Sequence, residues 1–134
     1  MNNNNKKVVF LGGTCNGSTW REELIPQLKI DSFDPVVPNW TPECQAEEVR
    51  QREICDYCLY VLTPKMTGVF AVAEVVDDSN KHPEKTILVV LTKDGNKEFE
   101  GHQIKALNKV IDMVIVNGGK GFKTLSEVAA YLNS

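Results

Sequence analysis

Short apolar runs, each bounded by turn-forming residues, set the hydrophobic pattern of this chain. The runs Val8–Leu11 and Thr86–Leu91 show no polar alternation, which is typical of strands that are covered on both faces of a sheet. Two further short strands are predicted over Phe33–Val37 and Tyr57–Leu62. The pattern therefore predicts four strands spread along the chain.

Segments with helical character lie between and after these strands. Thr19 and Glu22 have the T-x-x-E spacing of a capping box and predict a helix through Leu28, kinked at Pro26. Thr41 is predicted to cap a second helix, with a proline at its first position and a largely solvated, charged face. Further helices are predicted over Gly68–Asp78, residues 104–116 and Thr124–Leu132.

The elements alternate between strand and helix along most of the chain, and two helices come last. This order predicts an α/β fold with three layers, in which a central parallel sheet of four to five strands carries helices on both faces. In such sheets ligands bind beyond the carboxyl ends of the strands, where the strand order reverses. The loops that follow the first three strands are therefore the expected location of a site.

Composition and charge narrow the possible functions. The chain has 134 residues, of which 42% are hydrophobic and 25% charged, and we expect one domain over residues 8–134 after a disordered polar tail at 1–7. A net charge of −3 and the lack of a lysine or arginine stripe argue against a nucleic-acid polymer as partner. No apolar run approaches the ~20 residues that span a bilayer, and the polar start does not look like a signal peptide. We therefore expect a cytoplasmic protein without a membrane partner.

Four cysteines raise the question of a redox or metal site. Cys55 and Cys58 have C-x-x-C spacing, but they stand where a helix ends and a strand begins, whereas a redox pair gains thiolate stability at the start of a helix. A zinc site needs two more ligands, and the other cysteines and histidines offer no second close pair. We therefore expect small buried thiols, with no metal and no other cofactor.

The loops that follow the first three strands carry the candidate binding groups. The first contains Gly12-Gly13-Thr14, whose backbone N–H groups can hold a phosphate or can simply form a tight strand–helix turn. The second contains Asn39 and Trp40, and the indole can stack on a base or wedge the loop onto the sheet. The third contains Met66 and leads through Gly68 into the next helix.

Two acidic residues have plain structural interpretations. Glu74 stands in an otherwise apolar helical stretch, so its carboxylate must reach solvent or be held by hydrogen bonds. Asp77 and Asp78 follow three and four residues later and predict an exposed polar stripe that includes Glu74. Asp56 precedes the strand at 57–62 and is typical of a turn residue at a strand entrance. Spacing alone favours these structural interpretations.

Taken together and in order, several stretches resemble the nucleoside 2-deoxyribosyltransferase family. They are Val9–Gly13, Pro38–Trp40, Asp56–Pro64 and the helix that contains Ala73-Glu74. The resemblance runs from about Val8 to Leu132 and implies a flavodoxin-like fold. It also implies that a glutamate attacks the anomeric carbon of a deoxynucleoside or its 5′-monophosphate. The base then leaves, and a second base or water takes the sugar.

On this resemblance Glu74 is the catalytic nucleophile, and Asp56 is the aspartate near the sugar and the leaving base, a candidate general acid. The substrate-binding residues that it implies are Phe10, Gly12, Gly13, Thr14, Asn39, Trp40, Met66 and Gly68. The implied partner is a small nucleoside or nucleotide. Because members of the family build their pockets near subunit contacts, the resemblance also implies a homodimer or larger homo-oligomer.

Two positions depart from the family pattern. Phe10 stands where the family usually has a tyrosine that steadies the nucleophile, and Gly68 stands where it has an aspartate or serine that contacts the sugar. These departures leave a second hypothesis open, a nucleoside- or nucleotide-binding module that has lost its chemistry. A third hypothesis is a flavodoxin-like electron carrier. It needs an FMN phosphate loop and flanking aromatic residues, and only Trp40 points to it.

Overall fold

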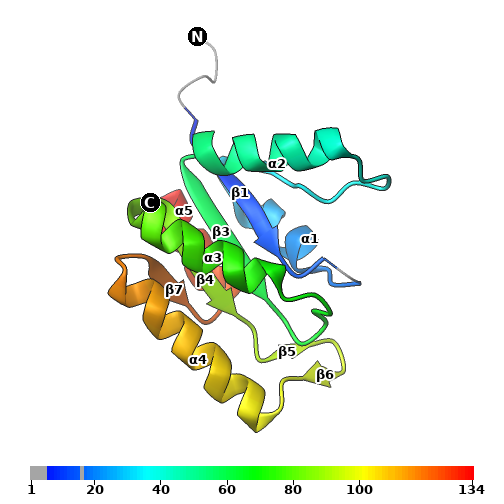
Figure 1. The fold of residues 1–134 in the computed structure, drawn as a ribbon, viewed down its shortest axis with the longest axis vertical. Coiled ribbons are helices and arrows are strands. Elements are labelled where there is room, and N and C mark those ends of the chain that lie inside the picture. The colour runs from blue at the N-terminus through cyan, green and yellow to red at the C-terminus, as the bar shows by residue number, and fades with distance from the viewer. Residues whose placement is uncertain (1–5, 16) are drawn as a thin grey trace.

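The structure is a computed structural model that describes residues 6–15 and 17–134. Most of the tail predicted over residues 1–7 lies outside the described residues. The five strands of the main sheet are all parallel and are flanked by helices, so the α/β architecture predicted from the pattern is confirmed (Figure 1). None of the helices in this part of the chain has the length and apolar content needed to cross a bilayer.

The main sheet has the order β2-β1-β3-β4-β7. Its strands are β1 (Val8–Gly13), β2 (Asp31–Phe33), β3 (Tyr57–Leu62), β4 (Thr86–Val90) and β7 (Lys120–Phe122). Counting only these strands, the order is 2-1-3-4-5, which is that of flavodoxin-like folds. The chain leaves β1 for the edge strand β2 and then crosses back to place β3 on the other side of β1. The strand order therefore reverses between β1 and β3.

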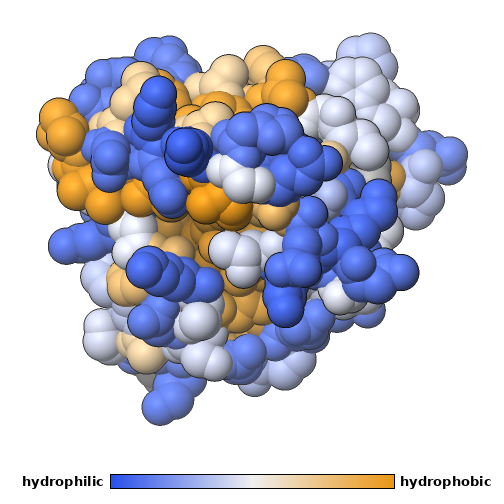
Figure 2. Space-filling model, turned by 90° about the horizontal axis from the view of Figure 1, so that it is seen from below, coloured by the Kyte–Doolittle hydropathy of each residue, from blue (hydrophilic) through white to orange (hydrophobic). Residues whose placement is uncertain are grey.

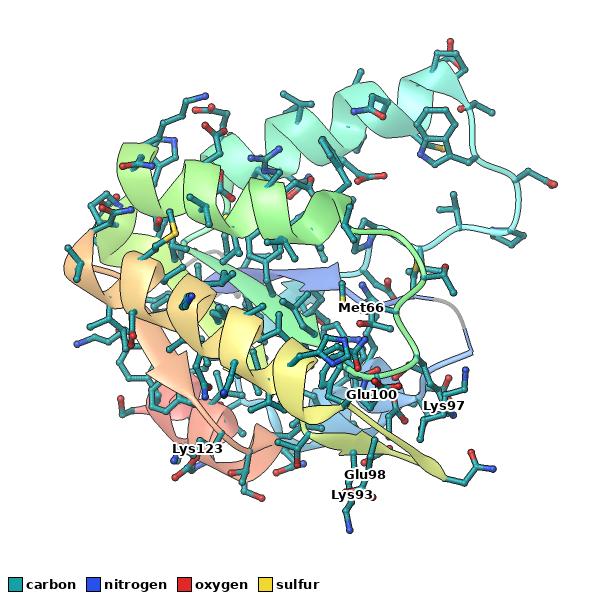
Figure 3. All side chains as sticks on the ribbon, turned by 60° about the horizontal axis from the view of Figure 1, so that its bottom comes forward. Met66, Lys93, Lys97, Glu98, Glu100 and Lys123 are labelled. Atoms are coloured by element: carbon teal, nitrogen blue, oxygen red, sulfur yellow. The ribbon has the colours of Figure 1, made fainter. Side chains whose placement is uncertain are left out.

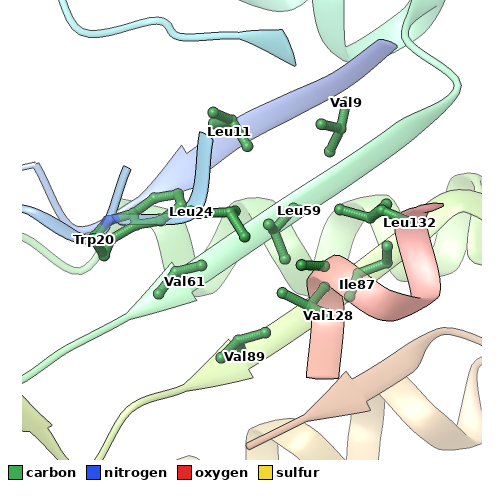
Figure 4. Packing of buried hydrophobic residues seen from close by; sticks show 11 residues of the cluster. Val9, Leu11, Trp20, Leu24, Leu59, Val61, Ile87, Val89, Val128 and Leu132 are labelled. Carbon is green, nitrogen blue, oxygen red and sulfur yellow. The ribbon is translucent and has the colours of Figure 1, made fainter. Parts of the chain in front are cut away.

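Helices cover both faces of the sheet and build two apolar clusters. Their bounds are α1 (Trp20–Leu24), α2 (Pro42–Ile54), α3 (Phe70–Lys81), α4 (Gly101–Val116) and α5 (Leu125–Asn133), with 3-10 turns η1 (Ile25–Gln27) and η2 (Pro83–Lys85). On one face α1 and α5 pack Trp20, Leu24 and Leu132 against alternate residues of the strands (Figure 4). On the other face α3 and α4 cover the remaining strand positions, including Phe10 and Tyr60. No residue of α2 is fully buried.

The second strand was predicted at the wrong place along the chain. It runs over Asp31–Phe33 and pairs with β1 from Val8↔Asp31 to Phe10↔Phe33, rather than extending from residue 33 to residue 37. Asp34 leaves the sheet because its carboxylate accepts a hydrogen bond from the Val36 amide at 3.0 Å and pairs with an arginine of α1. Pro35 has no N–H to donate to a ladder, so the chain continues as a loop.

Two strand features were not predicted. β7 is only three residues long, contains a glycine and pairs with β4 from Ile87↔Lys120 to Val89↔Phe122, so it offers no apolar run. The turn predicted near residues 93–96 lies within a hairpin of β5 (Lys93–Asp94) and β6 (Lys97–Glu98).

The ends of two helices test the capping predictions. The capping box predicted from Thr19 and Glu22 is wrong, because the Thr19 hydroxyl donates to the carboxylate of Glu23 at 2.9 Å and makes no cap bond. The cap of α2 is confirmed, since the Thr41 hydroxyl accepts from the amide of Cys44 at 3.3 Å. α2 thus begins at the predicted residue.

Candidate active site

A cavity of about 350 Å³ opens at the carboxyl ends of β1 and β3, where the strand order reverses. Its walls come from the ends of β1 and β3, the turn after β1, one side chain each of α1 and α2, the loop between β2 and α2, the loop after β3 and the first turns of α3. The face toward which these strands run carries apolar surface between hydrophilic side chains (Figure 2). This volume is within the usual size of small-molecule sites.

Glu74 lies on α3 and lines this cavity. Its side chain is only 15% exposed, and its Oε2 lies 3.4 Å from the Nη1 of Arg52 on α2. Burial raises the pKa of Glu74 to about 6; Arg52 opposes this rise, while the carboxylates of Glu48 and Asp78 add to it. At neutral pH the carboxylate is therefore mainly ionised and faces a largely apolar recess.

Arg52 joins Glu74 to a buried acid–phenol pair. Its Nη2 lies 2.7 Å and its Nε 3.3 Å from the two carboxylate oxygens of Asp78, which is buried. The Tyr60 hydroxyl on β3 donates to the same carboxylate at 2.5 Å. Asp77 is half exposed, with one oxygen 3.6 Å from the guanidinium. The prediction of an exposed acidic stripe is therefore wrong for Asp78 and Glu74, because α2 supplies a cation that covers them.

The turn after β1 is fastened to β3 by backbone and side-chain hydrogen bonds. The Thr14 amide donates to the Val61 carbonyl at 2.9 Å, and the Thr14 hydroxyl accepts from the amide of Thr63 at 2.9 Å. Gly13 has φ +112°, and a Cβ there would collide with the Val61 backbone. These contacts support the interpretation of a tight turn, since the Thr14 N–H points at a carbonyl rather than into the cavity.

Trp40 and Glu48 form the wall of the cavity on the side of α2. The indole Nε1 of Trp40 donates to the Oε2 of Glu48 at 3.3 Å, and Trp40 as a residue is 57% exposed. The indole is therefore fixed by α2 instead of being wedged onto the sheet. Asn39 is exposed and is not part of the cavity lining.

Asp56 lies at the opposite end of β3. Its carboxylate accepts from the Val8 amide at 2.8 Å, and its own amide donates to the Val8 carbonyl at 2.9 Å. Six strand residues, a length of roughly 20 Å, separate it from the carboxyl end of β3. Asp56 therefore closes the entrance of the strand and does not reach the cavity, so the structure does not support the role near the leaving base.

A family model described as nucleoside 2-deoxyribosyltransferase like matches residues 6–93, about two thirds of the chain. The chain belongs to the nucleoside 2-deoxyribosyltransferase-like family. The matched segment contains every residue that lines the cavity. No curated protein and no solved structure matches the chain.

The two departures from the nucleoside 2-deoxyribosyltransferase pattern both fall on the cavity. Phe10 is buried, and its ring stacks on Phe33 with centroids 5.9 Å apart, so it offers the cavity an apolar surface. Gly68 lies in the loop before α3, and a Cβ there would meet no other atom within 4 Å. Met66 stands in the same loop, whereas Lys93, Lys97 and Glu98 of the hairpin extend outward (Figure 3).

Sequence reasoning missed two charged residues of this nucleoside 2-deoxyribosyltransferase-like site. The sequence pattern predicts a solvated helix face for Glu48 and Arg52, yet Glu48 lines the cavity and Arg52 contacts Glu74. They are four residues apart and so share one side of α2. The sequence did carry one signal, the composition of α2. This helix has no apolar stripe, so the side that faces the rest of the protein must make its contacts through polar residues.

The structure also bears on the questions of a reactive cysteine pair and of a metal site. Cys55 and Cys58 are buried free thiols, and burial raises the pKa of Cys55 to about 11 and that of Cys58 to about 12. Thiols with such high pKa values are poor nucleophiles at neutral pH. Across residues 6–15 and 17–134, no group of three or more His, Cys, Asp or Glu side chains is arranged to hold a metal ion.

Proposed function

We propose that this protein breaks the N-glycosidic bond of a nucleoside, a deoxynucleoside in particular, or of its 5′-monophosphate, through a covalent glycosyl intermediate on Glu74. The observation that supports this most directly is a nearly buried carboxylate facing a cavity of nucleoside size. Membership of the nucleoside 2-deoxyribosyltransferase-like family supports the choice of ligand. The same family suggests a homodimer or larger assembly, which light scattering of the purified protein tests.

The reaction needs an ionised carboxylate close to the sugar. As the bond from C1′ to the base breaks, its electron pair goes to the base and positive charge develops on the sugar, as in retaining glycoside hydrolysis. One Glu74 oxygen then forms a bond to C1′ and gives a glycosyl ester. A second base, or water, attacks C1′ and releases the carboxylate; the proton that this nucleophile loses balances the one that the departed base anion takes up. Transfer and hydrolysis differ only in this last step.

Arg52 supports this chemistry from outside the reacting atoms. Its guanidinium lies 3.4 Å from one Glu74 oxygen and favours the ionised form against the desolvation that burial imposes. Phe10 cannot donate a hydrogen bond to the nucleophile. In this proposal Arg52 therefore stabilises the ionised form of Glu74 in place of such a hydrogen bond. The Asp78–Tyr60 pair holds Arg52 in position.

The decisive experiment is Glu74→Gln. Free base released from a panel of nucleosides and 5′-monophosphates is measured by chromatography, and we expect a loss of at least about a thousandfold in kcat because the amide cannot form the ester. Glu84→Gln, at an exposed position in η2, is the matched control and should leave the rate unchanged. A Glu74→Gln protein that is folded and as active as the parent would rule out the covalent mechanism.

A binding module without chemistry is the second candidate, and Phe10 in the cavity floor is the observation that favours it. A thermal-shift panel separates the two functions. A nucleoside that raises the Tm of the parent protein, with no base released over long incubation, supports the binder. Base release that depends on Glu74 excludes it.

A further inference from the structure

The wall of the cavity on the side of α2 combines an aromatic face with a carboxylate. Trp40 is more than half exposed, although its indole N–H is held by the Oε2 of Glu48. No residue of α2 is fully buried, so core packing does not explain why Glu48 faces the cavity. The hydrogen bond fixes the indole by its polar edge and leaves the ring available for stacking.

The charged side chains around the cavity differ in how fully they are already engaged by protein groups. Arg21 is the one basic residue in the described lining, and its guanidinium donates to the carbonyls of Leu11 and Thr14 at 2.7–3.1 Å. Glu74 is paired with Arg52. The contact with Trp40 engages only Oε2 of Glu48, and an ionised carboxylate can accept several hydrogen bonds. Glu48 is therefore the charged group of the lining that is best able to accept a hydrogen bond from a ligand.

From this arrangement we infer that Trp40 and Glu48 form the subsite for the base, and that Glu48 selects bases carrying an exocyclic amino group. The inference deepens the proposed function, on which it rests for the identity of the ligand. The indole stacks on the base, and the carboxylate accepts an N–H from its edge. A carboxylate is acceptor-only, so it repels an edge that presents only unprotonated ring nitrogens or carbonyl oxygens.

The expected selectivity follows from the strength of one hydrogen bond to a charged group. Such a bond corresponds to a preference of about tenfold to a hundredfold for a base with the amino group over the same base without it. The matched ligands are 2′-deoxyadenosine and 2′-deoxyribosylpurine, which differ only in the 6-amino group. Stacking on Trp40 is common to both, so their affinity ratio isolates the contribution of Glu48.

The test measures binding in the Glu74→Gln protein, so that no ligand is consumed. Each nucleoside is titrated while tryptophan fluorescence is followed, and the Trp40→Phe variant shows that the quenching arises from Trp40 rather than Trp20. We expect 2′-deoxyadenosine to bind about tenfold to a hundredfold more tightly. Adding Glu48→Ala should bring the ratio within about threefold, whereas Glu48→Gln, which keeps an acceptor, should give an intermediate ratio. Glu43→Gln, at an exposed position of the same helix, should preserve it.

Each result bears on one hypothesis at a time. A ratio near one with Glu48 present, a ratio that survives Glu48→Ala, or an absence of Trp40 quenching by either nucleoside overturns the base subsite. If the parent protein releases no base from any substrate while the Glu48-dependent ratio is observed, the catalytic proposal fails and the subsite stands. If Glu74→Gln abolishes turnover while Glu48→Ala leaves the ratio unchanged, the reverse holds.

Discussion

Two arginines with shielded guanidinium groups fasten neighbouring parts of the cavity wall in different ways. Arg21 on α1 donates to the carbonyls of Leu11 and Thr14, which are neutral backbone groups that never titrate, and its Nε also lies 3.3 Å from a carboxylate oxygen of the partly exposed Asp34. Arg52 on α2 pairs with the carboxylates of Glu74 and Asp78. The backbone hydrogen bonds of Arg21 hold the turn at every pH, whereas the ion pairs of Arg52 form a charge distribution that changes as its acids take up protons.

The difference separates two tasks within one cavity. The turn after β1 must hold its backbone close to β3, and neutral hydrogen bonds with a glycine at the tightest point are sufficient. The pair of helices α2 and α3 must hold the ionised Glu74 carboxylate, the proposed nucleophile, in an apolar recess, and this requires a cation with partners of its own. We therefore expect changes at the turn to act on folding, and changes between α2 and α3 to act on both stability and pH dependence.

Gly13→Ala should give the largest change in stability on the side of the turn. The residue has φ +112°, and a Cβ would overlap the Val61 backbone. We expect a loss of about 4 kcal/mol in the free energy of unfolding, from left-handed strain plus displacement of β3. Urea unfolding measures it. Gly68→Ala is the control, since a Cβ there meets nothing and its φ is not positive. Equal stability of the two variants would contradict this account of the turn.

Arg52→Met should destabilise the protein by about 3 kcal/mol, because it leaves the buried Asp78 carboxylate without its cation. It should also change the pH profile. Glu74 has a pKa of about 6, and the proposed mechanism requires its ionised form, so the rate of the parent protein should fall about tenfold per pH unit below this value. Removing Arg52 raises the pKa of Glu74, so the acid limb should move to higher pH.

Stability should respond to pH in the opposite sense. A carboxyl whose pKa is raised in the folded protein binds its proton more tightly there than in the unfolded chain, so its contribution is fully present below about pH 4.5 and is lost as the pH rises through 6. Glu74→Gln should remove this part of the pH dependence. Arg52→Lys, which keeps the charge, should restore much of the acid limb. If Arg52→Met lowers the Tm but leaves the acid limb at its original pH, Arg52 has only a structural role.

Most of the fold could be predicted from the sequence because its central strands are continuous apolar runs. β4 is buried throughout, β1 and β3 are buried at all but their end residues, and none of the three has a polar alternation to confuse the pattern. The edge strands β2 and β7, with three residues each, were misplaced or missed. Their position depends on pairing with β1 and β4, a tertiary effect that local pattern does not record.

The site was less predictable, and the errors have physical causes. The spacing of Glu74 to Asp77 and Asp78 indicates an exposed stripe. Only the resemblance to the family therefore identifies Glu74 as a site residue. The resemblance also predicts a site role for Asp56, although the rule that ligands bind at the carboxyl ends of strands argues against a residue that precedes β3. Glu48 and Arg52 were missed because their contacts join α2 to α3 and to the cavity wall across the fold.

Thr41→Ala should have the smallest effect, and it tests how far α2 depends on polar contacts. The Thr41 hydroxyl caps the helix at the Cys44 amide, and no α2 side chain is fully buried to compensate for its loss. We expect a loss of about 1 kcal/mol, measured by urea unfolding. Thr41→Ser keeps the cap oxygen and should stay close to the parent. Because Trp40 precedes the cap and Glu48 lies on the helix, Thr41→Ala should also weaken Trp40 quenching by 2′-deoxyadenosine while Thr41→Ser leaves it intact. If both variants lose the same stability, the cap is not what secures this wall of the cavity.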